Sequence, residues 1–69
     1  MEMKDVAFGS CLQHRTDKTD QPLVIKVNPD SVVVDDGEGN QKTLTAAQLA
    51  VYDEVMRMGA EDMAEYPQD

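Results

Sequence analysis

Two side chains near the start of the chain, Cys11 and His14, could form a thiolate–imidazole pair for nucleophilic catalysis. Side chains alternate along an extended strand, so a separation of three residues places them on opposite faces. A catalytic cysteine also requires an electropositive or helix-terminal setting, which the surrounding residues do not indicate. We therefore expect a half-buried thiol and a loop histidine. Because the chain has one cysteine and one histidine, a metal site built from these two residue types is not expected either.

A second spacing with chemical meaning is the alternation of Asp36, Glu38 and Asn40, which matches the first ligands of an EF-hand calcium loop. That pattern requires glycine at its sixth position and glutamate at its twelfth. Those positions hold Gln41 and Ala47, so the pattern fails. We interpret this stretch as a hairpin turn.

Catalysis by paired carboxylates would require a pocket that shifts their pKa values. The chain has four glycines and three aromatic residues, which is little material for such a pocket. The adjacent pairs Asp35-Asp36 and Glu61-Asp62 are typical of solvated surface, and no glycine-rich phosphate-binding motif is present. We therefore predict that the protein is not an enzyme and uses no cofactor.

The charge is strongly negative and unevenly distributed. The formal net charge is −8, and residues 35–69 contain nine acidic residues against two basic ones. A protein that binds nucleic acid directly needs a basic surface, and an anionic membrane makes the same demand. Direct contact with nucleic acid or membrane is therefore not expected, whereas a basic protein would be a suitable partner.

The first two thirds of the sequence alternate apolar runs with turn signals, as expected for an antiparallel sheet. Gly9, inside the first run, is typical of a bulge or a close backbone approach. Turns are indicated at 28–31, which contains Pro29, and at 36–40, which contains two glycines. The predicted strands comprise residues 6–12, 23–27, 32–34 and 41–44, the last of them brief.

A helix is predicted after the fourth strand. Thr45 and Gln48 have the spacing of a capping box, in which each side chain bonds the backbone of the other residue. Apolar residues then recur at helical spacing, with acidic residues on the opposite face. The helix either ends at Gly59 or continues to about Tyr66, and Pro67 ends it in both cases. The expected apolar face consists of Leu49, Tyr52, Val55, Met56 and Met63.

Together these elements predict one α+β domain spanning residues 1–69, with an ordered core at about 5–58 and a frayed C-terminal end. Its expected architecture is a small antiparallel sheet of three to four strands with one C-terminal helix packed on one face. The other face would then be uncovered. Val24 and Val33 fall outside the alternating core positions and are expected there, either as a dimer or partner contact or as isolated surface valines.

The predicted helix would align several carboxylates. Glu54, Glu61 and Glu65 recur at helical spacing, with Asp53, Asp62 and Asp69 beside them. Carboxylates one turn apart are about 6 Å from each other, close to the spacing of successive phosphates. With Asp35, Asp36 and Glu38 of the second turn, such a row could occupy a basic groove built for nucleic acid. The alternative is a solvated face that keeps a small protein soluble.

In size, acidity and absence of a catalytic set, the chain resembles small phage-encoded inhibitors that mimic DNA, such as anti-CRISPR proteins and gyrase inhibitors. The resemblance is compositional, covers no motif and assigns no residue. It implies an inhibitor or modulator of a basic, nucleic-acid-handling protein. The alternative hypothesis is a structural or assembly protein that oligomerises through its exposed sheet face. The polar N-terminus and the single cysteine predict a cytoplasmic protein, either monomer or homodimer.

Overall fold

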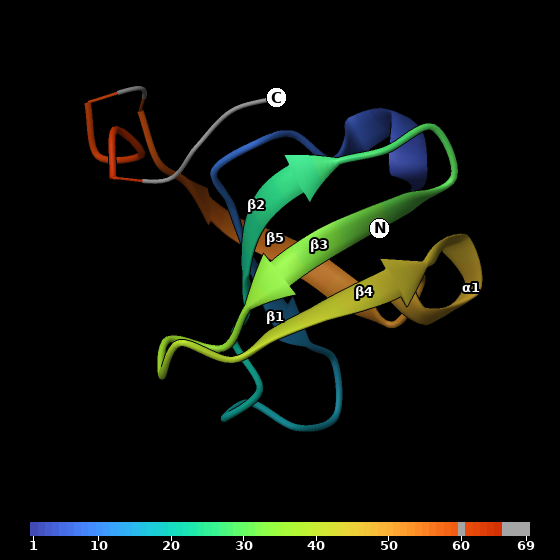
Figure 1. Ribbon diagram of the computed structural model, residues 1–69. Helices are drawn as coiled ribbons and strands as arrows, with labels where there is room; N and C mark the ends of the chain where they lie inside the picture. The colour runs from blue at the N-terminus through green and yellow to red at the C-terminus, as the bar shows by residue number, and fades with distance from the viewer. Residues whose placement is uncertain (60, 66–69) are drawn as a thin grey trace.

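The computed structural model describes residues 1–59 and 61–65, which form a curled five-stranded sheet with one short helix (Figure 1). Every strand pair is antiparallel, and the order across the sheet is β4-β3-β2-β1-β5. The elements are a 3₁₀ turn at Met3–Asp5, β1 (Ser10–His14), β2 (Leu23–Val27), β3 (Ser31–Asp35), β4 (Gln41–Thr45), α1 (Ala46–Leu49) and β5 (Tyr52–Arg57).

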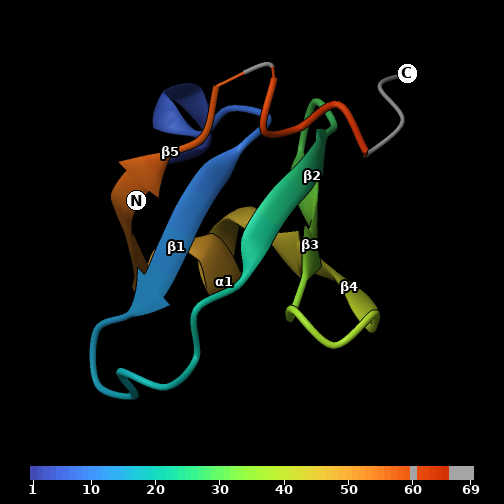
Figure 2. The same cartoon turned by 90° about the vertical axis from the view of Figure 1, so that its left-hand side faces the viewer.

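The curl of the sheet brings its two ends to opposite sides of the core. In Figure 1 β5 passes behind β3 and β4, and in the perpendicular view of Figure 2 these strands lie on opposite sides. The single turn of α1 joins β4 to β5 across this space. The core therefore lies inside the curve of the sheet, and the opposite, convex face is the outer one. The core residues are Val6, Leu12, Val24, Val32, Val34, Leu44, Leu49 and Tyr52, all buried.

The prediction of a long C-terminal helix was wrong. Residues 52–57 instead form β5, which pairs with β1 from His14↔Tyr52 to Ser10↔Arg57. Without β5, the backbone groups along this edge of β1 would have no partner, and β1 carries fully buried side chains. Pairing β1 with β5 satisfies them, which explains why the sheet has five strands and not three or four.

The start of the predicted helix is confirmed. The Thr45 hydroxyl accepts a hydrogen bond from the Gln48 amide at 3.3 Å, and the Gln48 side chain accepts one from the Thr45 amide at 2.9 Å. The α-helix covers only Ala46–Leu49, however, and buries Leu49 alone. Gly59 lies beyond β5 and outside any helix. The expected helix end at Tyr66 and Pro67, like the frayed terminus, lies outside the described residues.

The register of β2 corrects the placement of Val24. The pairing of β2 with β3 shifts between Val24 and Lys26, so Ile25 is an extra residue in the strand. Val24 pairs with Val34, and both side chains are fully buried in the core. Val24 therefore does not lie on the uncovered face, whereas Val33 is half-buried beside it in the sheet.

Gly9 confirms the expectation of a close backbone approach. It precedes β1 with a φ of +94°, and a β-carbon there would lie 2.8 Å from the carbonyl oxygen of Met58. The Gly9 amide donates to the Val24 carbonyl at 2.9 Å, and its carbonyl accepts from the Met58 amide at 2.9 Å. Gly9 thus joins β2 to the segment that follows β5, at a point where no side chain fits.

Candidate protein-interaction surface

Two of the predicted contact carboxylates, Asp53 and Glu54, are adjacent on β5 and engaged by arginines. Arg15 donates from Nε to both oxygens of Asp53 at 3.2 Å and from Nη2 at 3.1 Å. Glu54 accepts from the Ser10 hydroxyl at 2.7 Å and from Nε of Arg57 at 2.8 Å. These hydrogen bonds lower the pKa of each carboxyl, through Arg15 for Asp53 and chiefly through Ser10 for Glu54.

Because residues 52–57 form a strand, the continuous row of carboxylates expected on a helix does not exist. Asp53 and Glu54 point to opposite sides of β5, as neighbours on a strand do. Glu61, Asp62 and Glu65 lie in turns after β5 and are all exposed. The phosphate-like spacing is therefore lost, and Asp69 lies outside the described residues.

The acidic turn between β3 and β4 is confirmed as a hairpin connection, and two of its acids stabilise it. Asp35 is buried and accepts from the Gly37 amide at 2.7 Å. Asp36 accepts from the Glu38 amide at 2.8 Å, and this bond lowers the pKa of Asp36. Its other oxygen accepts from the Asn40 side chain at 3.1 Å. Glu38 is exposed without such a role in the turn, so it is the one carboxylate of the three free for a partner.

Cys11 and His14 have separate surroundings. The Cys11 thiol is half-buried near the Gly9 carbonyl, and burial, with a smaller effect of Glu54, raises its pKa. The His14 ring accepts at Nδ1 from the amides of Thr16 and Asp17, at 3.1 and 3.2 Å. A raised thiol pKa disfavours the nucleophilic thiolate, and His14 orients the loop that follows β1.

An apolar row that the sequence pattern does not predict crosses the outer face of the sheet. Cys11 is the cross-strand neighbour of both Leu23 on β2 and Met56 on β5, so the three side chains share one face. Met56 is 59% exposed, the largest exposed fraction among the large apolar side chains of the described residues. The alternation of β1 is the one sequence signal for this row, because the helical pattern of the C-terminal third predicts that Met56 lies on the core face of a helix.

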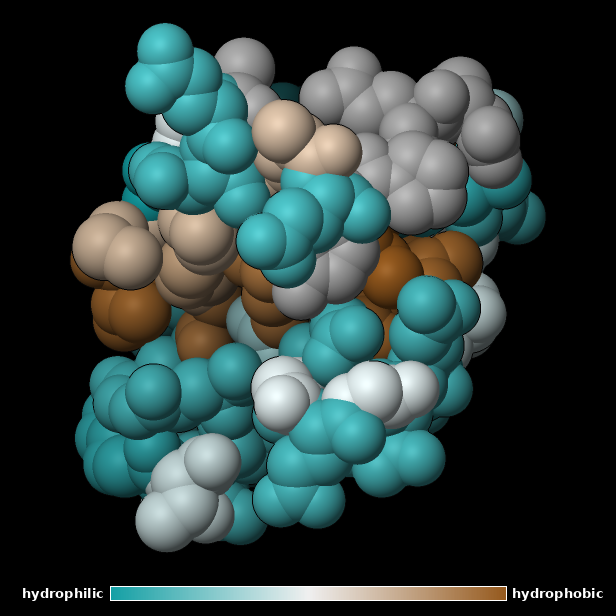
Figure 3. Space-filling view, turned by 60° about the vertical axis from the view of Figure 1, so that its left-hand side comes forward, coloured by the Kyte–Doolittle hydropathy of each residue, from teal (hydrophilic) through white to brown (hydrophobic). Residues whose placement is uncertain are grey.

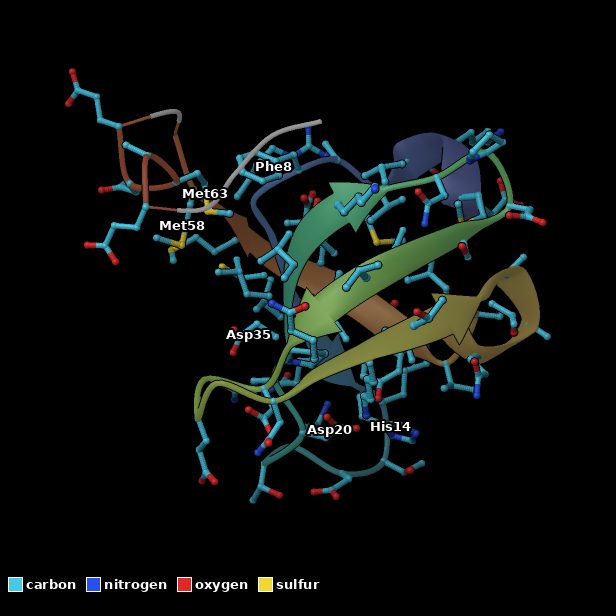
Figure 4. The ribbon with its side chains drawn as sticks, viewed as in Figure 1. Phe8, His14, Asp20, Asp35, Met58 and Met63 are labelled. Carbon is cyan, nitrogen blue, oxygen red and sulfur yellow. The ribbon has the colours of Figure 1, made fainter. Side chains whose placement is uncertain are left out.

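The row continues toward the segment that follows β5. Phe8 and Met58, both half-buried, lie near Gly9, and Met63 lies beside Met58 with 1% of its surface exposed (Figure 4). We call the accessible members of this surface the apolar patch: Phe8, Cys11, Leu23, Met56 and Met58. Figure 3 shows apolar residues forming a band across this side of the molecule, between hydrophilic regions.

Acidic side chains border the apolar patch at the end that follows β5. Glu61, Asp62 and Glu65 are exposed and lie in the turns around Met63. Basic residues on the same strands are fewer, and Arg57 already pairs with Glu54. A surface that combines an accessible apolar centre with an acidic border is typical of a protein-binding site.

Residues 1–59 and 61–65 contain no group of three histidine, cysteine or acidic side chains placed to hold a metal ion. Over the same residues, no helix has the length and apolar character needed to cross a membrane. Comparison with protein-family models, with curated proteins and with solved structures found no match to this chain.

Proposed function

We propose that the chain is a non-enzymatic protein-binding module whose contact surface is the apolar patch with its acidic border. The observation that carries this proposal is the exposure of Met56 within a row of three apolar side chains on neighbouring strands. Exposed apolar surface that is continuous over several strands is a common feature of binding sites. Methionine suits such a surface because its flexible, polarisable side chain adapts to the partner.

Charge specifies the partner that we propose. With a net charge of −8, two copies of the chain repel each other, and the acidic border would bring carboxylates together in a symmetric dimer. A partner with an apolar side chain surrounded by lysine or arginine fits better. Proteins that handle nucleic acid present basic surfaces of this kind, and an inhibitor or modulator of such a protein is the function we propose. This proposal does not include phosphate-spaced mimicry, which depended on the helix.

Affinity capture at low salt from cells of the source organism, followed by purification of the captured protein, provides the partner for a direct test. We expect Met56→Gln to weaken binding about tenfold, because a polar amide in place of a hot-spot apolar side chain at the centre of the contact costs about 1.4 kcal/mol. Val27→Gln is the matched control. Val27 is also exposed, but it lies at the end of β2 opposite Leu23, the member of the apolar patch on that strand. Equal binding by both variants and wild type would exclude the patch.

The role of charge is tested separately with the same partner. Neutralising Glu61 and Asp62 to Gln and Asn should slow association and flatten its dependence on salt. Asp30→Asn, in the turn between β2 and β3, removes a charge away from the acidic border. It should leave the association rate and its salt dependence nearly unchanged. Binding that does not respond to salt would rule out a basic partner. Light scattering of the isolated chain tests the alternative hypothesis, a protein that assembles through its exposed sheet face. A dimer that Val33→Asp dissociates would favour that hypothesis.

A further inference from the structure

The two edges of the sheet differ in how they are covered. At the β5 edge, the Met1 amino group donates to the Tyr52 carbonyl at 2.6 Å, and the Arg57 guanidinium donates to the Asp5 carbonyl at 3.0 Å. The N-terminal segment thus contacts β5 at both ends, and Figure 2 shows it beside that strand. Strand β4, the other edge, pairs with β3 and with no other strand of the described residues. A free edge presents unpaired backbone groups to any extended chain that reaches it.

The register of β4 identifies the backbone groups that are available. Lys42 pairs with Val34, Thr43 with Val33 and Leu44 with Val32. The Asp36 amide donates to the Asn40 carbonyl at 3.1 Å, which makes that pair hydrogen-bonded. Hydrogen-bonded and non-hydrogen-bonded pairs alternate in an antiparallel ladder, so the N–H and C=O of Thr43 point away from β3. Thr43 therefore offers both a donor and an acceptor at the open edge.

A hollow lies next to this edge, between β4, α1 and the start of β5. Its volume is about 410 Å³, and Leu44, Val51 and the ring of Tyr52 provide apolar surface within it. Val51 is 42% exposed, so the hollow is accessible to a side chain from another molecule. Such a hollow beside a free strand edge matches the way extended peptides bind by adding a strand.

The polar lining of the hollow specifies the kind of side chain that fits. It comprises His14, Lys42, Thr43 and Gln48, and none of the lining residues is acidic. In a chain with a net charge of −8, this is an unusual local composition. Within residues 1–59 and 61–65, Lys42 forms no ion pair, unlike Arg15 and Arg57. The ammonium of Lys42 is therefore available to a carboxylate from another molecule.

We infer that the free edge of β4 and the adjacent hollow bind an extended peptide segment that carries a carboxylate side chain. The peptide backbone pairs with Thr43, and the peptide residues opposite Lys42 and Leu44 direct their side chains toward the hollow. An acidic side chain contacts Lys42, and an apolar side chain packs on Leu44 and Tyr52. This site is separate from the apolar patch and does not depend on the function proposed for it.

The test uses the whole protein, labelled with ¹⁵N, and a blocked pentapeptide, acetyl-Thr-Val-Thr-Glu-Thr-amide. Its valine and glutamate lie on one face of a strand and match Leu44 and Lys42. We expect shifts of the Gln41, Thr43 and Thr45 amides at millimolar peptide. Binding should be about threefold to fivefold tighter than for the same peptide with glutamine in place of glutamate, as for an exposed ion pair.

Three variants distinguish this site from general attraction to an acidic peptide. Lys42→Gln should abolish the preference for glutamate over glutamine, whereas Lys18→Gln, which removes a charge outside the hollow, should preserve it. Thr43→Pro removes the free N–H without removing a ladder bond and should prevent binding of both peptides. If Thr43→Pro fails to fold, the Lys42 comparison still decides. Absence of shifts, shifts confined to the apolar patch, or an unchanged preference in Lys42→Gln would overturn the inference.

Discussion

The hydroxyl of Tyr52 donates a hydrogen bond of 2.5 Å to Oδ2 of Asp20, which joins β5 to the loop between β1 and β2. The His14 ring packs edge-on against the Tyr52 ring, with centroids 5.1 Å apart. Burial raises the pKa of Tyr52 to about 12, and the bond to Asp20 contributes in the same direction. The same residue thus anchors the loop, completes the core and lines the hollow beside β4.

Replacing Tyr52 by phenylalanine should lower the free energy of unfolding by about 1–2 kcal/mol at neutral pH, because Asp20 loses its donor while the ring remains. The pKa of Tyr52 is higher in the folded state than in the unfolded state. Its contribution is therefore complete below about pH 10 and is lost as the pH rises toward 12. Urea unfolding of wild type and Tyr52→Phe across this range should show the two unfolding free energies converging. A constant difference between them at every pH would contradict a stabilising hydrogen bond between Tyr52 and Asp20.

Gly9→Ala should destabilise the protein by about 2–4 kcal/mol, since it combines an unfavourable backbone conformation with a clash against the Met58 carbonyl. Gly39 has a similar φ of +90° with open space around it, so Gly39→Ala reports the backbone term alone, about 1–2 kcal/mol. Chemical denaturation measures the unfolding free energy of both variants, and the difference between their losses is the cost of the clash. Equal losses would mean that the segment after β5 moves away without cost.

The register of β2 and β3 predicts different effects for two neighbouring valines. Val24→Ala should cost about 2 kcal/mol, because Val24 is fully buried and its truncation leaves a cavity in the core. Val33→Ala should cost less than about 1 kcal/mol, because that side chain is half-buried. Thermal or urea unfolding measures both. A reversed order would indicate that β2 is shifted by one residue, which exchanges its two faces.

Glu54 should contribute to the acid sensitivity of the protein. Its pKa is lowered in the folded state by the Ser10 hydroxyl and by Arg57. The stabilisation is therefore present above the unfolded pKa, near 4, and is lost as the pH falls below it. Glu54→Gln keeps an acceptor for Ser10 but cannot titrate, so its unfolding free energy should fall less between pH 7 and pH 3. Glu38→Gln, in the exposed hairpin turn, is the control, and its unfolding free energy should fall between pH 7 and pH 3 by as much as that of wild type.

By itself, the sequence determined the features that depend on contacts a few residues apart. The turns around Pro29 and between Asp36 and Asn40 follow from residues that favour those backbone angles. The capping box of Thr45 and Gln48 is equally local. The need for glycine at position 9 was also visible, although the neighbour that imposes it, Met58, was not.

The tertiary structure decided what residues 52–57 become, and with them the candidate site. Their apolar spacing fits a helix, but Tyr52 and Val55 favour a strand equally well, and short apolar runs do not distinguish the two. Pairing with β1 decides between them, because it supplies hydrogen bonds to the edge of a strand about forty residues earlier in the sequence. That choice separated the carboxylates expected on one helix face and placed Met56 beside Cys11 on the outer face. Local preference cannot specify such a partner, since the energy that selects it arises only once the sheet has formed.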